Sequence, residues 1–488
     1  MKDINYRNLM VSREISLKKA LEIIHRERCG IIMAVNTKKE LIGIATETDL
    51  RQSILSAGNL DEKLEKLLNR KPVTIQKGTS LEEILKIIDK KRVSLLPVLQ
   101  GKRVVGLLTI IGLLSRLKKQ YSISSPTMPA TGKIKRRLDT IFKTGLITNA
   151  VYVNNLERNI EKYLGVKHAI AVSNCTSGLM LVIKCLGLSG KIIVPSFTFP
   201  ATVHAIAWNG LEPVFCDCDR ESFNIDVDHV ERLISKDRNA IVGVDIFGNP
   251  CNYEKLKKIA RTNNVKLFYD SAHSLGAAYS TKMAGNFGNA QVFSLAPTKI
   301  MIAGEGGIIT TNDSHLAEQL RIGRNYGNPG DYNTQFVGLN ARMPEFNAIL
   351  GLESLEMLKQ NIRRRQKLVK IYKEELSKIP GISFQKIETN ATSTYNYFAI
   401  MVEPSLYGVD NESLCELLKK RNIMTRIYFY PPVHLHKAYE RYKKQNLPNT
   451  EFVVKRVLCL PLYSHMLDTD VVMIASAIRD IHFKNAKR

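Results

Sequence analysis

The segment FSLAPTKIMIAGEGGIITTND, residues 293–313, decides the fold of this 488-residue chain. Its first apolar run ends at Ser294, Lys299 follows five residues later, and a glycine-rich turn leads into a second run, GIITTN (307–312). Two short apolar runs separated by small and turn-forming residues are typical of buried strands. The apolar residues after Lys299 favour a neutral amine there, the form of lysine that condenses with carbonyl groups. The alternative is a surface lysine in an ordinary loop.

Short apolar runs of the same kind recur upstream, separated by patterns typical of amphipathic helices. They are HAIAVSN (168–174), KIIVPS (191–196), PVFCDCD (213–219), AIVGVDIFG (240–248), KLFYDSA (266–272) and AQVFSL (290–295). With GIITTN, these buried strands alternating with helices predict an α/β fold with a mostly parallel seven-stranded sheet. Ligands of such sheets bind where the parallel strands end.

Residues at these strand ends suit the parts of one ligand. SNCTSG (173–178) opens a helix, so its free N–H groups and the Thr176 hydroxyl form a candidate phosphate site, with an ordinary helix cap as the alternative. Asp270 ends the run KLFYDSA, and a buried carboxylate needs a cation such as a protonated pyridine nitrogen. The alternative is an Asp that caps the next turn. Phe199 in PSFTFPAT (195–202) either covers a planar ring or packs in the core.

These motifs together resemble the DegT/DnrJ/EryC1/StrS family of sugar aminotransferases from about Thr148 to the C-terminus. The resemblance implies a pyridoxal-phosphate-dependent transferase of fold type I, with a C-terminal α+β subdomain, that acts as a homodimer with active sites at the subunit interface. Further matching motifs are YLGVKHAIAVSNCTSG (163–178), GLNARMPEFNAILG (338–351) and LCLPLY (458–463).

The resemblance also implies a role for each matching residue. Lys299 would bind the cofactor aldehyde and shuttle protons, while Asp270 would face the ring nitrogen. The other implied cofactor contacts are His273 near the ring O3′, Phe199 on the ring face, and Cys175, Thr176, Ser294 and the partner's Asn340 at the phosphate. Cys175 departs from the Gly or Ala expected there, which is harmless if its backbone N–H does the binding.

Substrate contacts follow from the same resemblance. YFYPPVHLH (428–436) resembles the segment that touches the nucleotide sugar, which makes Tyr430 and His434 candidates. Arg324-Asn-Tyr-Gly lacks the His that relatives often carry before this Gly, so the contacts there stay open. Relatives with a dehydratase outcome carry His at the position of Lys299, and the lysine of this chain favours amino transfer.

The implied reaction is transfer of an amino group from L-glutamate to a nucleotide-linked keto sugar, an NDP-4-keto-6-deoxy sugar, for glycan or amino-sugar synthesis. One alternative is a 3-keto sugar substrate. The other is a catalytically silent, ligand-sensing regulator on the same fold, although such a sensor needs no combination of Lys299, Asp270 and the glycine run.

The N-terminal region contains an internal repeat. SLKKALEII (16–24) aligns with SLEEILKII (80–88), and ELIGIATETDL (40–50) with RVVGLLTIIGL (103–113). The repeats resemble a CBS pair, which implies an adenine nucleotide such as AMP or ATP bound through Thr46 and Asp49. Gly112 replaces this Asp in the second copy. The alternative is a dimerisation or docking module without a ligand.

These patterns predict the following division of the chain. A CBS pair occupies 1–118, with repeats at about 8–57 and 68–118, and a linker rich in Ser, Thr, Pro and Lys occupies 119–135. The aminotransferase follows at 136–488, with its large domain reaching to about 365 and the small subdomain spanning 366–488.

Composition limits the remaining function classes. The net charge of +25 is spread out, since residues 1–120 carry a surplus of 11 and the rest carry 14, which argues against nucleic-acid binding. The eight cysteines show no CxxC pair and no metal-ligand spacing, so we expect no metal and reduced thiols. No apolar run is long enough to span a bilayer, so we expect a cytoplasmic protein without membrane insertion.

Overall fold

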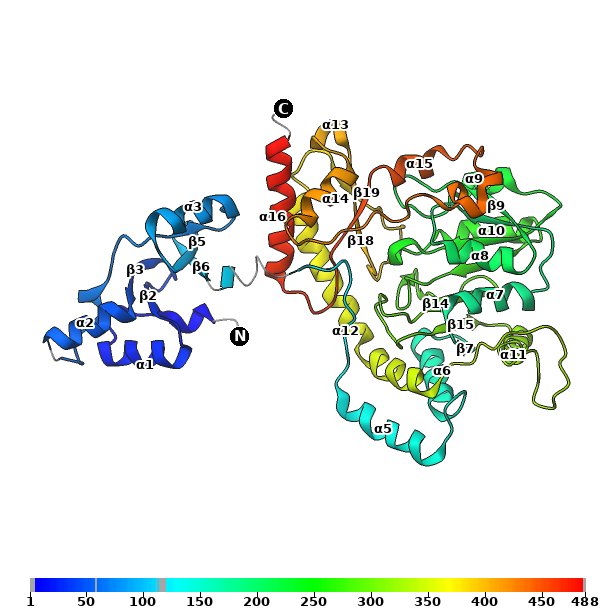
Figure 1. Cartoon of the computed structure of the whole chain (residues 1–488), viewed down its shortest axis with the longest axis horizontal. Helices are drawn as coiled ribbons and strands as arrows, with labels where there is room; N and C mark the ends of the chain where they lie inside the picture. Colours follow the sequence, from blue (N-terminus) through cyan, green and yellow to red (C-terminus); the bar gives the residue numbers. More distant parts are fainter. Residues whose placement is uncertain (1–4, 58, 111, 114–119, 486–488) are drawn as a thin grey trace. The chain divides into compact units, whose positions relative to one another are not determined.

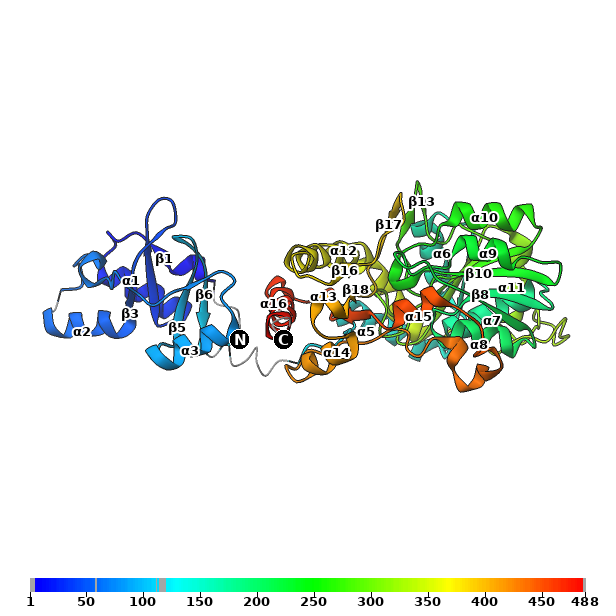
Figure 2. The same cartoon turned by 90° about the horizontal axis from the view of Figure 1, so that it is seen from above.

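The computed structural model describes residues 5–57, 59–110, 112–113 and 120–485, and the chain divides into two compact units, Met1–Gln120 and Tyr121–Arg488. Figures 1 and 2 show both units, each with its strands at the centre and helices packed against them. None of the helices in the described part of the chain is long and apolar enough to cross a membrane.

The first unit contains two copies of one supersecondary motif, as the repeat predicts. Its elements are η1 (Tyr6–Leu9), β1 (Met10–Val11), α1 (Leu17–Glu27), β2 (Ile31–Val35), β3 (Leu41–Thr46), α2 (Glu47–Ala57), η2 (Leu64–Leu67), β4 (Ile75–Gln76), α3 (Leu81–Lys91), β5 (Leu95–Gln100) and β6 (Arg103–Thr109). Ser16 and Ser80 cap α1 and α3 in the same way, each accepting a hydrogen bond from the N–H three residues on. Leu99 and Val104 of the second copy pack into the core of the first, so the two copies share one core.

The second unit contains a seven-stranded sheet in the order β7-β15-β14-β11-β10-β8-β9. Its strands are β7 (His168–Val172), β8 (Lys191–Pro195), β9 (Glu212–Cys216), β10 (Arg238–Val244), β11 (Lys266–Asp270), β14 (Ala290–Ser294) and β15 (Gly307–Thr311). In this sheet β15 runs in the direction opposite to the other six strands. The seven runs singled out in the sequence are these seven strands, and the predicted mostly parallel sheet is confirmed.

Helices cover both faces of this sheet. They are α6 (Val151–Leu164), α7 (Cys175–Cys185), α8 (Pro200–Trp208), α9 (Val227–Leu233), α10 (Tyr253–Thr262), α11 (Ser314–Gly323) and the long α12 (Glu345–Leu376). Ile192 and Val194 of β8 pack against the α7, α8 and α11 side, whereas Ile193 packs against the α9 and α10 side. This alternation along a strand buries both faces, as the continuous apolar runs require.

The C-terminal part adds a smaller antiparallel sheet, β16 (Ile382–Phe384), β18 (Phe398–Val402) and β19 (Val457–Leu460). Its helices are α13 (Pro404–Tyr407), α14 (Asn411–Lys419), α15 (Pro448–Val454) and α16 (Asp468–Asn485). Helix α12 links the two cores, because Leu352 packs with the large sheet and Leu368 with the small one. The division expected near residue 365 therefore falls inside one continuous helix.

Residues 121–135 of the stretch expected to be a linker belong to the second unit. Tyr121 is 2% exposed, and its N–H donates to the Asn422 carbonyl at 2.8 Å. Helix α5 (Thr131–Thr144) begins inside the stretch. Most residues of this amphipathic helix are polar, and several are Lys or Arg. Composition alone therefore indicates a linker here.

Candidate active site

Three strand ends meet at one edge of the large sheet. Asp270 ends β11, Ser294 ends β14, and α7 begins at Cys175 just after β7. The Cys175 Sγ lies 3.9 Å from Asp270 Oδ1 and 3.8 Å from the Val292 carbonyl, which ties the start of α7 to β11 and β14. The structure thus brings together residues that are far apart in the sequence.

Asp270 is a buried carboxylate with free acceptor capacity. It is 5% exposed, and its partners are the Thr202 hydroxyl, which donates to Oδ2 at 2.6 Å, and the Ala272 N–H, which donates to Oδ1 at 3.1 Å. Burial raises its pKa, while the Thr202 hydroxyl, the Ala272 N–H and the charge of Lys299 oppose that rise. An ionised carboxylate accepts about four hydrogen bonds, so Asp270 has room for another donor.

A second buried carboxylate, Asp245, provides a comparison because its capacity is filled. It accepts from the hydroxyls of Tyr253, Ser271 and Ser274, each at 2.7 Å, and from the Cys251 N–H at 3.0 Å. Through Ser271 and Ser274 it holds the loop after β11, and through Cys251 and Tyr253 it holds the segment after β10. The open side of Asp270 therefore fits a cationic ring nitrogen, whereas Asp245 has a structural role.

Lys299 lies in the turn after β14, beside the same group of residues. Its N–H donates to the Ala296 carbonyl at 3.0 Å, and its side chain is half-buried. Two backbone hydrogen bonds anchor this turn. The Ile300 N–H donates to the Asn396 side-chain oxygen and the Ile302 N–H donates to the Ser354 hydroxyl oxygen, both at 3.0 Å. The Lys299 charge acts on Asp270, Cys175 and His273, so these four side chains form one electrostatic cluster.

His273 is held as a neutral imidazole. Its ring is 8% exposed, and its Nδ1 lies 3.3 Å from the Phe247 N–H, which donates to it. Burial and then the Lys299 charge lower the pKa of His273 well below 6.5. Because Nδ1 accepts, the remaining proton lies on Nε2, which leaves a donor on the other side of the ring.

The start of α7 provides unused N–H groups. Asn174 caps the helix by accepting from the Ser177 N–H at 2.8 Å, while within the described residues the amides of Cys175 and Thr176 have no protein acceptor. Gly307 lets β15 pass close to this turn, because a Cβ there would lie 2.7 Å from the Asn174 carbonyl carbon and 2.8 Å from the Cys175 nitrogen. The glycine-rich segment therefore shapes a helix N-terminus suited to an anion.

Several other predicted residues lie on the surface. Phe199 directly precedes α8 and is 58% exposed, and Tyr430 is 55% exposed, so both are free to contact a ligand. Asn340 is exposed and forms a backbone bridge with Asn325. Ser294 is almost buried, and its hydroxyl lies 3.4 Å from the Ala296 N–H.

Two residues of the segments discussed for the substrate have buried side chains. His434 has no exposed surface, and its Nδ1 lies 2.6 Å from the Ser196 hydroxyl. Arg324 is 5% exposed, pairs with Glu157, and donates to the Ala171 carbonyl at 2.8 Å. Both side chains hold elements together, which no local sequence signal reveals because their partners are far away in the chain.

Thr202 is the principal site residue that sequence reasoning missed. In the motif PSFTFPAT the sequence points to Phe199. In the structure the Thr202 hydroxyl donates to Asp270, and the hydroxyl oxygens of Thr198 and Thr202 lie 2.8 Å apart. The four-residue spacing of these threonines at a helix start was the available signal, since such side chains lie on one face.

In the first unit, Thr46 and Asp49 form reciprocal hydrogen bonds at the start of α2. The Thr46 N–H and hydroxyl donate to Asp49 Oδ2 at 2.8 and 2.7 Å, and the Asp49 N–H donates back to the Thr46 hydroxyl oxygen at 3.2 Å. In the second copy the Gly112 N–H donates to the Thr109 hydroxyl oxygen at 2.9 Å, which keeps the cap without the carboxylate. The first copy alone therefore presents an acidic side chain at this cap.

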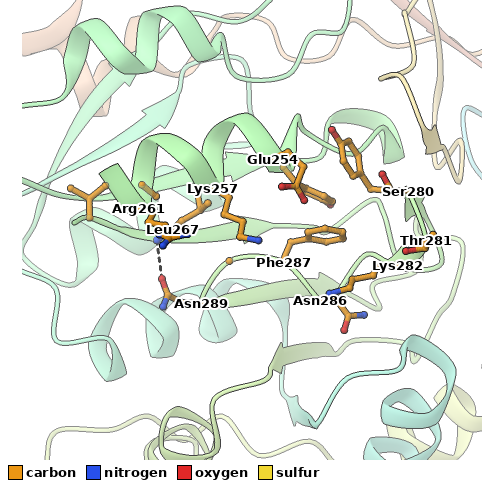
Figure 3. A pocket seen from close by; sticks show the side chains of 15 residues that line it. Glu254, Lys257, Arg261, Leu267, Ser280, Thr281, Lys282, Asn286, Phe287 and Asn289 are labelled. Carbon is orange, nitrogen blue, oxygen red and sulfur yellow. Dashed lines mark hydrogen bonds between the residues drawn. The ribbon is translucent and has the colours of Figure 1, made fainter. Parts of the chain in front are cut away.

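A cavity of about 390 Å³ lies at the opposite end of β11 from Asp270. Figure 3 shows its lining, which includes Lys257, Arg261 and Phe287, beside the residues that begin the strand. None of the predicted site residues lines it, so this cavity is separate from the cluster around Lys299.

Comparisons with known proteins agree with this geometry. Residues 130–479 match the DegT/DnrJ/EryC1/StrS aminotransferase family, and 1–56 and 64–119 match the CBS domain. A dTDP-4-amino-4,6-dideoxy-D-glucose transaminase of Escherichia coli is 32% identical over 74% of this chain and 98% of the relative. A dTDP-3-amino-3,6-dideoxy-alpha-D-galactopyranose transaminase of Aneurinibacillus thermoaerophilus is 32% identical over 71% and 94%.

A solved structure, DesI in the presence of its TDP-sugar product, superposes with a TM-score of 0.72 at 32% identity, covering 76% of this chain and 95% of DesI. The chain belongs to the DegT/DnrJ/EryC1/StrS aminotransferase family and carries an N-terminal CBS domain pair. It is a pyridoxal-phosphate-dependent aminotransferase of fold type I.

Proposed function

We propose that this enzyme transfers the amino group of L-glutamate to a nucleotide-linked 4-keto-6-deoxy sugar. The observation that carries the proposal is the open acceptor side of buried Asp270 beside Lys299. The substrate class is supported by the transaminase relatives and by DesI with its TDP-sugar product. The E. coli relative is named for a 4-amino sugar, whereas the A. thermoaerophilus relative is named for a 3-amino sugar, which keeps 3-keto sugars as the alternative.

Pyridoxal phosphate supplies an aldehyde that takes up the amino group and a protonated ring that withdraws electrons from the reacting carbon. Asp270 fits the ring nitrogen, and its negative charge keeps that nitrogen protonated. The amides of Cys175 and Thr176, with the Thr176 and Ser294 hydroxyls, fit the phosphate at the N-terminus of α7. The Nε2–H of His273 is the donor available for the ring oxygen O3′.

Lys299 performs the proton transfers. Its amine would remove the α-proton of the amino donor and later deliver a proton to the sugar carbon that receives the amine. The buried residues Ile300, Met301 and Ile302 keep the turn apolar and exclude water from its inner side. Exposed Phe199 would cover one face of the ring, and Tyr430 is an exposed aromatic residue available to the nucleotide sugar.

We also propose that two copies of the chain form the active dimer. Large apolar side chains are exposed where α5, α6 and α12 begin or end, namely Phe142, Leu146, Ile147, Val151 and Phe346. The rings of Phe142 and Phe346 lie 6.1 Å apart, so part of this set is contiguous. A second copy would bury such a patch and bring the partner's Asn340 to the phosphate site.

For the CBS pair we propose an adenine nucleotide that alters activity. Support comes from the exposed Asp49 carboxylate at the start of α2, which can turn from Thr46 to a ribose hydroxyl. The second copy offers no such group at Gly112, which favours one site in each chain. A docking module without a ligand is the alternative.

A single-turnover experiment tests the proposed function. The enzyme loaded with pyridoxal phosphate is mixed with L-glutamate, and formation of pyridoxamine phosphate is followed by absorbance before a 4-keto sugar nucleotide is added. We expect glutamate-dependent conversion and return of the original spectrum with the 4-keto sugar. A return only with a 3-keto sugar would select the alternative substrate, and no conversion in either half would indicate a silent regulator.

A further inference from the structure

The buried carboxylate of Asp270 is held by a chain of two threonines. Thr202, in the first turn of α8, is 1% exposed, and Thr198, just before this helix, is fully buried. The Thr202 hydroxyl lies 2.6 Å from Asp270 Oδ2, and 2.8 Å separates it from the Thr198 hydroxyl. The same segment presents Phe199 on the exposed side, so one turn holds both a ring cover and a carboxylate partner.

Counting protons shows which group donates in each of these two hydrogen bonds. A hydroxyl has one hydrogen, and an ionised carboxylate only accepts, so the Thr202 proton must lie toward Asp270. The Thr202 oxygen can then only accept from Thr198, which donates to it. Each hydroxyl polarises the next, and both dipoles favour the negative charge on Asp270.

Four other titratable groups surround Asp270. Lys299 from the turn after β14 favours its anion, whereas Asp245 at the end of β10 disfavours it. The Cys175 thiol from α7 lies 3.9 Å away, and burial raises its pKa, so it stays neutral. His273 is also neutral. Thr202 makes the shortest hydrogen bond to Asp270 among the described contacts, at 2.6 Å.

We propose that Thr202, supported by Thr198, is a positioning residue for amino transfer that keeps Asp270 ionised and fixed in rotation against the cofactor ring nitrogen. The proposal rests on the proposed function, because it needs the ring to bind at Asp270. Thr202 does not touch the reacting atoms. Its effect reaches them through the protonation of the ring nitrogen, which weakens when the carboxylate loses its best donor.

The test uses the holoenzyme loaded with pyridoxal phosphate labelled with ¹⁵N in the ring, whose nitrogen chemical shift reports protonation. Thr202→Val keeps the shape and removes the hydroxyl. Without its hydroxyl donor the Asp270 carboxylate is more basic and competes for the proton that it shares with the ring nitrogen. We therefore expect the nitrogen signal, followed as a function of pH, to move toward that of the unprotonated ring near neutral pH. We expect kcat to fall at least tenfold, with a smaller change in the KM for the keto sugar.

Matched variants separate this effect from a general loss of packing. Thr202→Ser retains the hydroxyl and should restore the wild-type titration, while Thr198→Val should shift it in the same direction by less. Thr450→Val is the control, because the Thr450 hydroxyl also donates to a buried carboxylate, Asp217, at 2.7 Å, but outside the site. We expect it to lower stability without moving the nitrogen signal.

An unchanged titration in Thr202→Val overturns the proposal, and so does a shift in Thr202→Ser as large as that in Thr202→Val. If Thr202→Val does not fold, Thr198→Val decides by the same criterion. Failure of the wild-type chain to bind pyridoxal phosphate at Lys299 would instead remove the proposed function, so the two failures are distinguishable.

Discussion

At the residue scale, the site depends on how two buried carboxylates differ. Asp245 accepts from four protein donors and is complete. Asp270 accepts from two close donors and from the Cys175 thiol at 3.9 Å, and it lies near the charge of Lys299. Leaving a buried carboxylate partly unsatisfied costs free energy, so such a position is informative about a missing cationic partner. The ring nitrogen of the cofactor is that partner in the proposed mechanism.

Asp270→Asn tests this interpretation because it keeps the shape and removes the charge. We expect the rate of amino transfer to fall about 10²- to 10³-fold, the loss typical of one electrostatic stabiliser. The variant should still bind pyridoxal phosphate, since the phosphate site is untouched. Asp245→Asn is the contrasting variant, and we expect it to lower the unfolding temperature. A fully active Asp270→Asn enzyme would contradict the assignment.

His273 gives a pH-dependent prediction for the apoprotein. Its pKa in the folded state lies well below 6.5 because of burial, so the unfolded state binds more protons as the pH falls below 6.5. Stability should therefore decrease on acidification through this range. We expect His273→Gln to reduce the slope of unfolding free energy against pH by up to about 1.4 kcal/mol per pH unit. Urea unfolding between pH 5 and 7 measures it, and equal slopes would contradict the burial argument.

At the element scale, the sequence predicts the sheet well and the side-chain partnerships less well. Each of the seven apolar runs becomes a strand because an apolar run between turn signals has few other stable environments. The role of Thr202 and the burial of His434 depend on partners 68 and 238 residues away, which periodicity does not report. In the stretch expected to be a linker, 119–135, helix α5 begins at Thr131, and its mostly polar residues explain why composition does not indicate it.

The close passage of β15 beside α7 is testable with Gly307→Ala. The new Cβ would lie within 2.8 Å of backbone atoms of Asn174 and Cys175, which cannot move like a flexible side chain. We expect at least a tenfold weaker affinity for pyridoxal phosphate and a destabilisation of about 1–3 kcal/mol, as overpacking typically gives. Gly132→Ala in α5 is the control, because nothing lies within 4 Å of its added Cβ. Equal affinities for the two variants would rule out the shaping role.

At the scale of the whole molecule, the proposed dimer makes each active site depend on two chains. Lys299→Ala removes the amine from its own site, and Asn340→Ala impairs the neighbouring one. When the two inactive variants are mixed and allowed to exchange subunits, one site in each mixed dimer regains both groups. We expect up to about a quarter of wild-type activity, because random exchange makes half the dimers mixed and each has one intact site. No recovery in exchanged dimers would contradict shared sites.

The CBS pair is best tested in the full chain by calorimetry with AMP and ATP. We expect binding to one site per chain, lost in Asp49→Ala. That substitution also removes the acceptor of the Thr46 N–H and hydroxyl, so Thr109→Ala serves as a control for loss of hydrogen bonds at the corresponding helix start, because it removes the acceptor of the Gly112 N–H in the second copy. Equal heats for wild type and Asp49→Ala would remove the proposed nucleotide site.

The central claim, that Lys299 holds pyridoxal phosphate opposite Asp270, has one most direct measurement. The holoenzyme is reduced with borohydride, digested, and the phosphopyridoxyl group is located by peptide mass spectrometry. The account predicts one modified peptide, labelled on Lys299. A label on any other lysine, or none at all, would contradict it.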